Sequence, residues 1–177
     1  MNIIGIAAPK GGGKDTAADY LIKCMPWRKK VSFADPLKTM LQVGLDLSEA
    51  QLWGDLKEEV DPRYGVTPRY LMQTLGTEWG RDMVKNDLWV EAAKTLYAGE
   101  QIVIADVRNV PGNVEAKYVR DNGLLIHVVG RTEYTGEHIS ETAIPFEPGD
   151  GVISNTGSLE DLYKEMIPLV DALTCWE

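Results

Sequence analysis

Apolar residues occur in short runs that alternate with longer polar segments along the whole chain. The runs have the length of strands that are buried on both faces of a sheet. The segments between them are long enough for helices. The pattern therefore predicts a three-layer α/β fold, with right-handed crossovers and helices on both faces of a parallel sheet. The expected strands cover residues 3–7, 30–33, 101–108, 124–129 and 151–155.

Capping residues and prolines mark the expected helix starts. Thr67 and Asp35 are typical cap residues, and each is followed directly by a proline, Pro68 and Pro36. Each pair predicts the start of a helix. Residues 158–161 have a spacing like that of a capping box and predict the start of the last helix. Further helices are expected at 88–98 and 113–122. In the helix after residue 67, apolar residues recur every four positions and are expected to face the core: Leu71, Leu75 and Trp79.

A glycine-rich segment joins the first expected strand to the first helix, and it reads Ala8-Pro9-Lys10-Gly11-Gly12-Gly13-Lys14-Asp15-Thr16. It resembles the phosphate loop G-x-x-x-x-G-K-[ST], in the strand–turn–helix context that this motif requires. Glycines allow positive φ angles, so that successive backbone N–H groups point at one anion. The helix N-terminus adds partial positive charge and Lys14 adds a full charge. Together these features predict a polyphosphate site.

The motif departs from its usual pattern at two positions. Ala8 replaces the first glycine, and Asp15 stands where Ser or Thr normally holds Mg²⁺, with the hydroxyl of Thr16 one residue later. A glycine-rich turn with an incidental lysine is the plain structural alternative. A dinucleotide-binding fold is disfavoured, because a G-x-G-x-x-G pattern starting at Gly11 has Thr16 at its third glycine.

Composition excludes several classes of protein. At 177 residues and 44% hydrophobic, the chain is expected to form one compact domain, residues 1–177. A net charge of −9 and a pI near 4.8 argue against a sequence-independent nucleic-acid binder. No apolar run reaches the ~20 residues of a membrane span, and neither a membrane span nor a signal peptide is expected. Cys24 and Cys175 lack metal or C-x-x-C spacing and are expected to be reduced thiols of a cytoplasmic protein.

Polar residues gather at the expected carboxyl ends of the strands, where parallel sheets bind their ligands. Asp106 is expected to reach Mg²⁺ directly or through water; the alternative is a carboxylate that caps the next turn. Asp35, taken by itself, is more simply a helix N-cap. His127 lies inside the fourth apolar run and is expected to be a hydrogen-bonded core histidine. The residues at these strand ends are Asp35, Asp106, Arg108, Arg131 and Asn155.

These residues resemble those of the deoxynucleoside monophosphate kinases of bacteriophages, a branch of the phosphate-loop nucleoside monophosphate kinases. The resemblance covers nearly the whole chain. It implies a sheet order of 2-3-1-4-5, a mobile monophosphate-binding segment at about 35–89 and a lid at about 131–150. In that family Asp replaces the Ser or Thr that binds magnesium, so Asp15 fits. The motifs are Gly13-Lys14-Asp15-Thr16, Phe33-Ala34-Asp35-Pro36-Leu37-Lys38, Leu75-Gly76-Thr77-Glu78-Trp79-Gly80-Arg81, Asp87-x-Trp89-Val90, Ala105-Asp106-Val107-Arg108, His138-x-Ser140-Glu141 and Asn155-x-Gly157-Ser158-Leu159.

The resemblance implies Mg²⁺-dependent transfer of the γ-phosphate of ATP to a deoxynucleoside monophosphate (dNMP), giving dNDP and ADP. The implied catalytic residues are Lys10, Lys14 and Arg131, and the implied magnesium ligands are Asp15 and Asp106. ATP is expected to bind Gly11, Gly12, Gly13, Lys14, Asp15, Thr16 and Arg131. The dNMP is expected to bind Lys10, Asp35, Lys38, Arg69, Gln73, Trp79, Arg81, Trp89, Arg108, His138 and Glu141.

Two other classes of protein stay open. Another small-molecule phosphate-loop kinase, of the phosphomevalonate or dephospho-coenzyme A type, would share the loop and the sheet. A nucleotide-dependent switch would have no acceptor and would not need Arg69, Gln73 and Arg81 grouped on one helix; the N-K-x-D element of guanine-nucleotide switches is also absent. The expected partners are small nucleotides, without nucleic acid or membrane, and a homodimer stays open. The host cytoplasm is the expected location if a phage encodes the chain.

Overall fold

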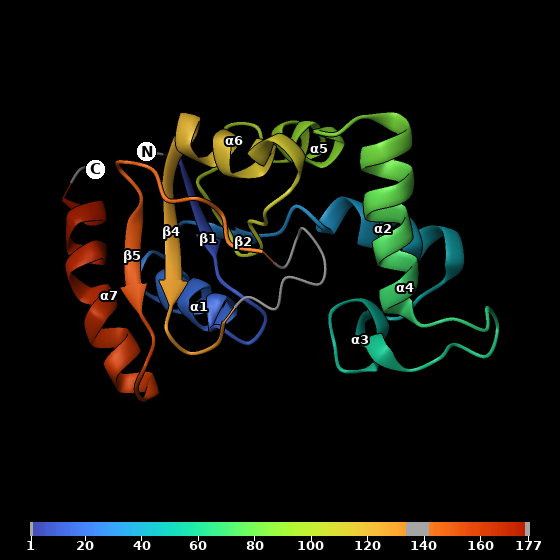
Figure 1. Cartoon of the computed structure of the whole chain (residues 1–177), viewed down its shortest axis with the longest axis horizontal. Helices are drawn as coiled ribbons and strands as arrows, with labels where there is room; N and C mark the ends of the chain where they lie inside the picture. Colours follow the sequence, from blue (N-terminus) through green and yellow to red (C-terminus); the bar gives the residue numbers. More distant parts are fainter. Residues whose placement is uncertain (1, 134–141, 176–177) are drawn as a thin grey trace. The chain divides into compact units, whose positions relative to one another are not determined.

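The computed structural model of the chain describes residues 2–133 and 142–175. The chain divides into two compact units (Figure 1). The sheet unit contains Met1–Ser32 and Tyr97–Glu177, and the helical unit contains Phe33–Leu96. The segment expected to bind the monophosphate, 35–89, lies inside the helical unit, and its mobility stays a prediction. Among the described residues, no helix has the length and the apolar character that a membrane crossing requires.

Five strands build the sheet unit: β1 Ile3–Ala7, β2 Lys29–Val31, β3 Ile102–Ile104, β4 Gly123–Val129 and β5 Gly151–Ser154. They form one parallel sheet with the order β2-β3-β1-β4-β5, which confirms the predicted order. Since β1 is the central strand, Ile4 pairs with Val103 on one side and with Leu124 on the other.

Two strands end earlier than predicted. β2 ends at Val31 instead of residue 33, and β3 ends at Ile104 instead of residue 108. Beyond β3, the backbone N–H of Arg108 donates to the carboxylate of Glu115 over 2.9 Å. The Ala105 and Val107 N–H groups still donate to the Val31 and Ile6 carbonyls over 3.0 and 3.1 Å, so backbone bonding to the neighbouring strands continues past β3. It ends where the Arg108 N–H turns to Glu115.

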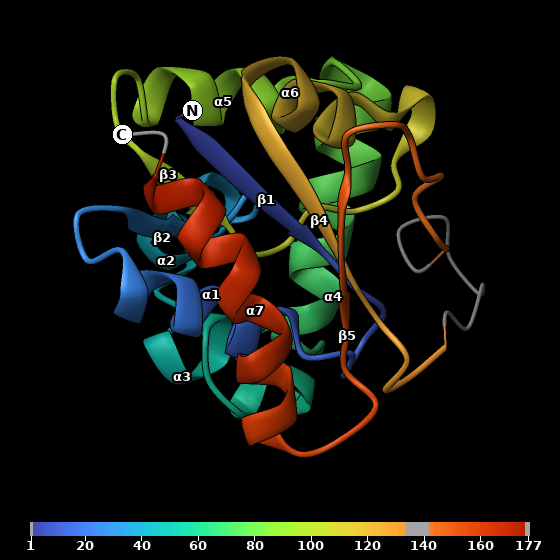
Figure 2. The same ribbon diagram turned by 90° about the vertical axis from the view of Figure 1, so that its left-hand side faces the viewer.

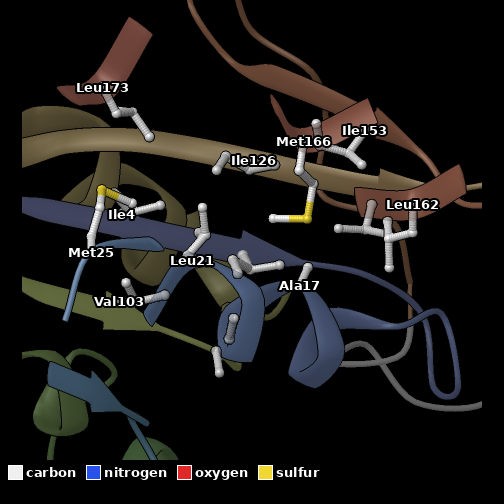
Figure 3. Packing of buried hydrophobic residues seen from close by; sticks show 14 residues of the cluster. Ile4, Ala17, Leu21, Met25, Val103, Ile126, Ile153, Leu162, Met166 and Leu173 are labelled. Carbon is white, nitrogen blue, oxygen red and sulfur yellow. The ribbon is translucent and has the colours of Figure 1, made fainter. Parts of the chain in front are cut away.

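The helices of the sheet unit are α1 Lys14–Cys24, α6 Val114–Asn122 and α7 Leu159–Thr174, with a short 3₁₀ turn at Pro111–Asn113. Side chains alternate along β1, so Ile4 and Ile6 share one face and are fully buried there. Apolar side chains of α1 and α7 pack against them in one core (Figure 3). The two helices lie side by side (Figure 2), and the rings of Tyr20 and Tyr163 stack with their centroids 4.3 Å apart.

The opposite face of the sheet is covered by α6. Gly5 points to this face, and a Cβ atom there would lie 2.7 Å from Val119 of α6 and 2.9 Å from Val107. Glycine is required for such a close approach of strand and helix. Helices on both faces of an all-parallel sheet confirm the predicted α/β class.

The helical unit consists of α2 Asp35–Leu45, α3 Glu49–Leu52, a 3₁₀ turn at Leu56–Glu58, α4 Pro68–Gln73, η2 Thr74–Val84 and α5 Leu88–Leu96. Its helices start within one residue of the predicted positions, but Asp35 is wrong as the cap of α2: it is the first residue of the helix, and Ala34 holds the cap position without a side-chain hydrogen bond. Pro36 lies in the first turn of α2, and the Thr67 hydroxyl accepts a hydrogen bond from the Tyr70 N–H over 3.1 Å. In the sheet unit, Ser158 and Asp161 form a capping box at the start of α7, as predicted.

The helix that starts at Pro68 changes type at Thr74. Its second part, η2, is an 11-residue π-helix, a form that is rare and normally limited to single turns. The wider i→i+5 turn moves residues four positions apart off a common face. The predicted core position of Trp79 is therefore wrong: its side chain is 39% exposed, whereas Gly76 and Gly80 are buried.

Candidate active site

The segment between β1 and α1 has the backbone of an anion-binding loop. Gly11 and Gly13 adopt left-handed conformations, with φ angles of 75° and 97°. The Gly12 N–H donates to the Pro9 carbonyl over 2.9 Å, which closes a turn, and the Ala17 N–H donates to the Gly13 carbonyl over 2.9 Å. The N–H groups in the first turn of α1 have no acceptor within the helix. The loop therefore presents N–H donors and the positive end of the helix dipole to an anion.

Opposite charges meet at the start of α1. Lys14 Nζ lies 3.4 Å from one oxygen of Asp15, and Lys30 Nζ lies 3.5 Å from the other. Lys30 also contacts Asp19 one turn further along α1, at 2.8 Å. Lys30 was not predicted as a site residue, because its place beside α1 follows from long-range strand pairing. Thr16 lies partly buried in the first turn of α1.

Two side chains from the β4–β5 side of the sheet bind carbonyl groups of the loop. The Thr132 hydroxyl donates to the Lys10 carbonyl over 3.0 Å. The Asn155 amide donates to the Gly12 carbonyl over 2.9 Å, and Asn155 is only 3% exposed. The sequence placed Asn155 at a strand end without a role. It gave no local signal for Thr132.

The predicted acid after the third strand lies at the same edge of the sheet as the loop. Asp106 follows β3, the neighbour of β1, and accepts a hydrogen bond from the Ser32 hydroxyl. The side chain of Arg108 is exposed. Its backbone is fixed by Glu115, which is only 1% exposed.

The two residues predicted to bind Mg²⁺, Asp15 and Asp106, carry carboxylates, the kind of oxygen ligand that this cation prefers. Within residues 2–133 and 142–175, no three His, Cys, Asp or Glu side chains are grouped to hold a metal ion. Mg²⁺ with a nucleotide does not need such a group, because one or two carboxylates and phosphate oxygens satisfy it. Asp15 at the start of α1 and Asp106 beyond β3 are carboxylates of this kind, both in the sheet unit.

The other predicted phosphate-binding residues of the sheet unit lie near its surface. Lys10 is exposed at the tip of the phosphate loop. Arg131 is also exposed, directly after Gly130, which has a φ angle of 100°. His138 and Glu141 lie outside the described residues.

In the helical unit, two predicted acceptor-binding residues meet Trp53. The Trp53 indole N–H donates to Asp35 over 3.4 Å, and the Lys38 ammonium lies 5.2 Å from the centre of an indole ring. A cation in this position is attracted to the face of the ring. Trp53 is 41% exposed and was missed in the sequence, where it stands in an irregular stretch.

Three further predicted residues lie on α4 and η2. Arg69 forms an ion pair of 3.1 Å with Glu58, and the Arg81 guanidinium donates to the Gly76 carbonyl over 3.3 Å. Gln73, at the end of α4, is exposed. Glu58 is 62% exposed, so its pair with Arg69 is weak and open to exchange for a phosphate.

The two tryptophans expected to touch the nucleoside differ in exposure. Trp79 is 39% exposed, whereas Trp89 is 3% exposed. The Trp89 indole N–H donates to the Gly76 carbonyl over 2.7 Å. This position favours a packing role for Trp89 and leaves Trp79 as the candidate for contact with the nucleoside.

His127 is the core histidine that the sequence predicted. Its Nε2 lies 2.9 Å from Asp150, its ring stacks on Phe146, and burial lowers its pKa below the usual 6.5. Burial alone would raise the pKa of Asp150, but hydrogen bonds from Arg120, the Glu147 backbone and His127 lower it to about 2. These contacts link α6 and β4 to the segment before β5, and the groups are not expected to take part in chemistry.

Comparison with known proteins supports the resemblance noted in the sequence. The profile of the family described as deoxynucleotide monophosphate kinase matches residues 55–166. A protein of Acanthamoeba polyphaga mimivirus, provisionally named a deoxynucleotide monophosphate kinase, is 32% identical over 191 aligned positions, which cover 97% of each chain.

Two enzymes named deoxynucleotide monophosphate kinase are similar over part of the chain. That of Escherichia phage RB69 is 36% identical over 105 positions, which cover 55% of this chain and 42% of the phage enzyme. That of Enterobacteria phage T4 is 30% identical over 124 positions, which cover 63% and 48%. With the profile match and the mimivirus relative, these similarities show that the chain belongs to the deoxynucleotide monophosphate kinase family and is a phosphotransferase of the kinase class.

Proposed function

We propose that the chain transfers the γ-phosphate of ATP to the phosphate of a dNMP, giving dNDP and ADP. The observation that carries this proposal is the phosphate loop, in which Gly11 and Gly13 are left-handed and Lys14 begins α1. The family supplies the class of acceptor, because the relatives are named as deoxynucleotide monophosphate kinases.

The loop is proposed to bind the phosphates of the donor. Its N–H groups and the Lys14 ammonium are donors to the β- and γ-phosphates, and Thr16 reaches further back along the chain of phosphates. Negative charge spreads over the transferring group in the transition state, so donors that are already in place lower the barrier. Lys10, at the exposed loop tip, follows the transferring group, and Arg131 adds a second cation to the ATP phosphates.

The magnesium ligands are proposed to be Asp15 and Asp106. When bound, the ion withdraws charge from the phosphates and makes the transferring group easier to attack. Both carboxylates belong to the sheet unit, as the loop does. They would hold the ion directly or through water, as this strongly hydrated cation prefers.

The helical unit is proposed to bind the dNMP. Arg69 and Arg81 offer planar guanidinium groups that pair with a phosphate in bidentate geometry. Gln73 and Trp79 are exposed on the same helical segment and are candidates for the base and the sugar. Asp35 is also proposed to bind the dNMP, and Lys38 of the same unit and Arg108 of the sheet unit are proposed to assist with its phosphate.

A substrate screen tests this function. The four dNMPs and their ribose counterparts are each incubated with ATP and Mg²⁺ in a coupled assay for ADP, beside dephospho-coenzyme A, phosphomevalonate and no acceptor. We expect turnover with at least one dNMP and little without an acceptor. The Lys14→Ala variant should fold and lose roughly 10²–10³-fold or more of the turnover. Preference for one of the other two acceptors would assign another kinase class, and equal turnover without an acceptor would assign an ATPase or switch.

A further inference from the structure

We propose that Thr132 and Asn155 are positioning residues that hold the phosphate loop in its anion-binding conformation before the nucleotide arrives. This inference rests on the proposed function, because it concerns how the donor phosphates are bound. Neither residue is assigned a role by the loop motif. Both lie far from the loop in the sequence, and both donate to its carbonyl groups.

The carbonyl groups that they bind control the direction of the loop N–H groups. A peptide bond is planar, and its C=O and N–H point in opposite directions. The carbonyl of Lys10 shares a peptide plane with the N–H of Gly11, and the carbonyl of Gly12 shares one with the N–H of Gly13. When Thr132 and Asn155 fix these two carbonyls, they also fix the N–H groups of two glycines that would bind phosphate.

The contact between Asn155 and the loop is close and buried. Asn155 is 3% exposed, and a Cβ atom on residue 13 would overlap its amide nitrogen. Gly13 is therefore needed for two reasons, its φ angle of 97° and the side chain that lies against it. A glycine-rich loop has many alternative conformations, and this packing removes some of them.

Thr132 and Asn155 follow the ends of β4 and β5, and the backbone is well packed at these two strand ends. The Asn155 backbone N–H donates to the Val129 carbonyl over 2.7 Å, which extends the β4–β5 pairing beyond the last residue of β5. Gly130 has a φ angle of 100°, and a Cβ atom there would lie 2.5 Å from the Thr156 side chain. The turns after β4 and β5 are thus packed together and form a firm support for the loop.

A preformed loop binds phosphate better than a flexible one. Ordering a flexible segment on binding costs conformational entropy, which reduces the affinity. Donors that are already aligned also stabilise the transition state without reorganisation. Loss of the hydrogen bond from Thr132 or from Asn155 should therefore weaken the binding of any polyphosphate at the loop, with or without a nucleoside attached.

The experiment compares donor-side and acceptor-side binding in paired variants. Thr132→Val keeps the shape of the side chain and removes its donor, whereas Thr132→Ser keeps the donor. Asn155→Asp replaces the amide donor by a carboxylate oxygen. Asn122→Asp is the matched control, because the Asn122 amide donates to the Tyr118 carbonyl over 2.8 Å at the end of α6. Calorimetry gives the dissociation constants of ADP and of tripolyphosphate, and melting curves give the stability.

We expect Thr132→Val to weaken ADP and tripolyphosphate binding by about five- to tenfold, the usual effect of losing one hydrogen bond. Asn155→Asp should weaken it further, because its carboxylate also repels phosphate. Thr132→Ser and Asn122→Asp should bind as the parent does, and the KM for the acceptor should stay unchanged in all four. Unchanged affinities in both donor-deleting variants would overturn the proposal. A lower melting temperature with unchanged affinities would also overturn it and leave a purely structural role.

Thr132 is exposed, so its substitutions are expected to leave the fold intact. The test therefore gives a result even if Asn155→Asp does not fold. In that case the pair Thr132→Val and Thr132→Ser gives the answer. The outcome is also separate from that of the proposed function. Tripolyphosphate has no acceptor partner, so a parent that binds it tightly and phosphorylates no dNMP would refute the function and leave the positioning role intact.

Discussion

At the scale of single residues, the charges around the phosphate loop are balanced within the protein. Asp15 lies between Lys14 and Lys30, and all three side chains are at least one quarter exposed, with Asp15 at 66%. Ion pairs in such exposed positions are worth about 0–1 kcal/mol. Lys14 can therefore leave Asp15 for a phosphate at little cost. When Lys14 moves to the phosphate, Lys30 still has Asp15 as an ion-pair partner.

Asp15→Ser tests this balance. The substitution supplies the usual hydroxyl ligand of magnesium but removes a negative charge beside the nucleotide phosphates. We expect half-maximal turnover to need more Mg²⁺, and metal-free ADP to bind more tightly because the repulsion is gone. Turnover at several Mg²⁺ concentrations and calorimetry in EDTA measure the two effects. Asp19→Ser is the control, since Asp19 also pairs with Lys30 but lies one turn away. An unchanged Mg²⁺ dependence would mean that Asp15 acts only on the helix terminus.

Single residues also show why the site could be predicted only in part. The motif spacing was enough to find Lys14 and the loop glycines, because these residues are neighbours in the sequence. Thr132, Asn155 and Lys30 meet the loop only through the pairing of strands distant in the chain. Asn155 stood out as a strand-end residue and in the motif Asn155-x-Gly157-Ser158-Leu159, but its contact with the loop did not. Thr132 and Lys30 are common residue types, and no local spacing distinguishes them from ordinary surface residues.

At the scale of elements, the π-helix η2 packs closely against α5. Gly80 lies against the Trp89 ring, and a Cβ atom there would be 2.6 Å from it. The Trp89 indole N–H binds the Gly76 carbonyl, as described above. Helix caps follow local rules and could be predicted, as at Thr67. The choice between α and π geometry involves a partner 13 residues away, so a period of 3.6 residues gave the wrong face for Trp79.

Gly80→Ala and Gly44→Ala separate packing from helix propensity. Alanine favours a helix over glycine, but at position 80 its methyl group would overlap the indole ring. We expect Gly80→Ala to destabilise the protein by about 1–3 kcal/mol, as overpacking does. Gly44 lies in α2, and a Cβ atom there would meet nothing within 4 Å beyond its own helix, so Gly44→Ala should stabilise by up to about 1 kcal/mol. Urea unfolding measures both. A stabilised Gly80→Ala variant would contradict the close packing.

At the scale of the whole molecule, stability should depend on pH through the buried cluster of Arg120, His127 and Asp150. Arg120 donates to Asp150 over 2.7 Å, and His127 lies 2.9 Å from the same carboxylate. Burial lowers the pKa of the His127 imidazole in the folded state. On acidification, the imidazole therefore takes up a proton at a higher pH in the unfolded chain than in the folded one. Asp150, whose pKa is lowered to about 2, likewise favours the folded state above its ordinary pKa. The contribution of each group to the free energy of unfolding therefore decreases as the pH falls.

His127→Gln isolates the histidine contribution. The parent should lose more free energy of unfolding than the variant between pH 7.5 and 5, because only the parent has a buried imidazole to protonate. Urea unfolding at several pH values gives the difference, in which the titration of other carboxylates cancels. Asp150 continues to lose its contribution in both proteins down to about pH 2. If the variant showed the larger loss, the imidazole would be charged in the folded state at neutral pH.

The fold class was predictable at this scale, because strand lengths and their alternation with helices leave few arrangements of a parallel sheet. The division into a sheet unit and a helical unit was harder to see. Residues 33–96 follow the second strand without any change in composition that marks a boundary, and their helices are short and joined by irregular segments. Composition therefore predicts a single domain, whereas the family resemblance implied a separate monophosphate-binding segment at about 35–89, which lies inside the helical unit.

The two units should respond to different substrates, and tryptophan fluorescence can report this. Trp79 is 39% exposed in the helical unit, and Trp27 is 52% exposed in the sheet unit. If the helical unit binds the dNMP, adding an accepted dNMP alone should change the emission of Trp79, since an indole responds to the loss of surrounding water. The measurement uses a Trp53→Phe background, because Trp53 is 41% exposed in the same unit and would also respond. In that background, Trp79→Phe should remove most of the change, and Trp27→Phe should keep it. Tripolyphosphate alone, which occupies the loop, should leave the Trp79 signal unaltered. A change that survives Trp79→Phe and disappears in Trp27→Phe would place the acceptor on the sheet unit and reverse the proposed assignment.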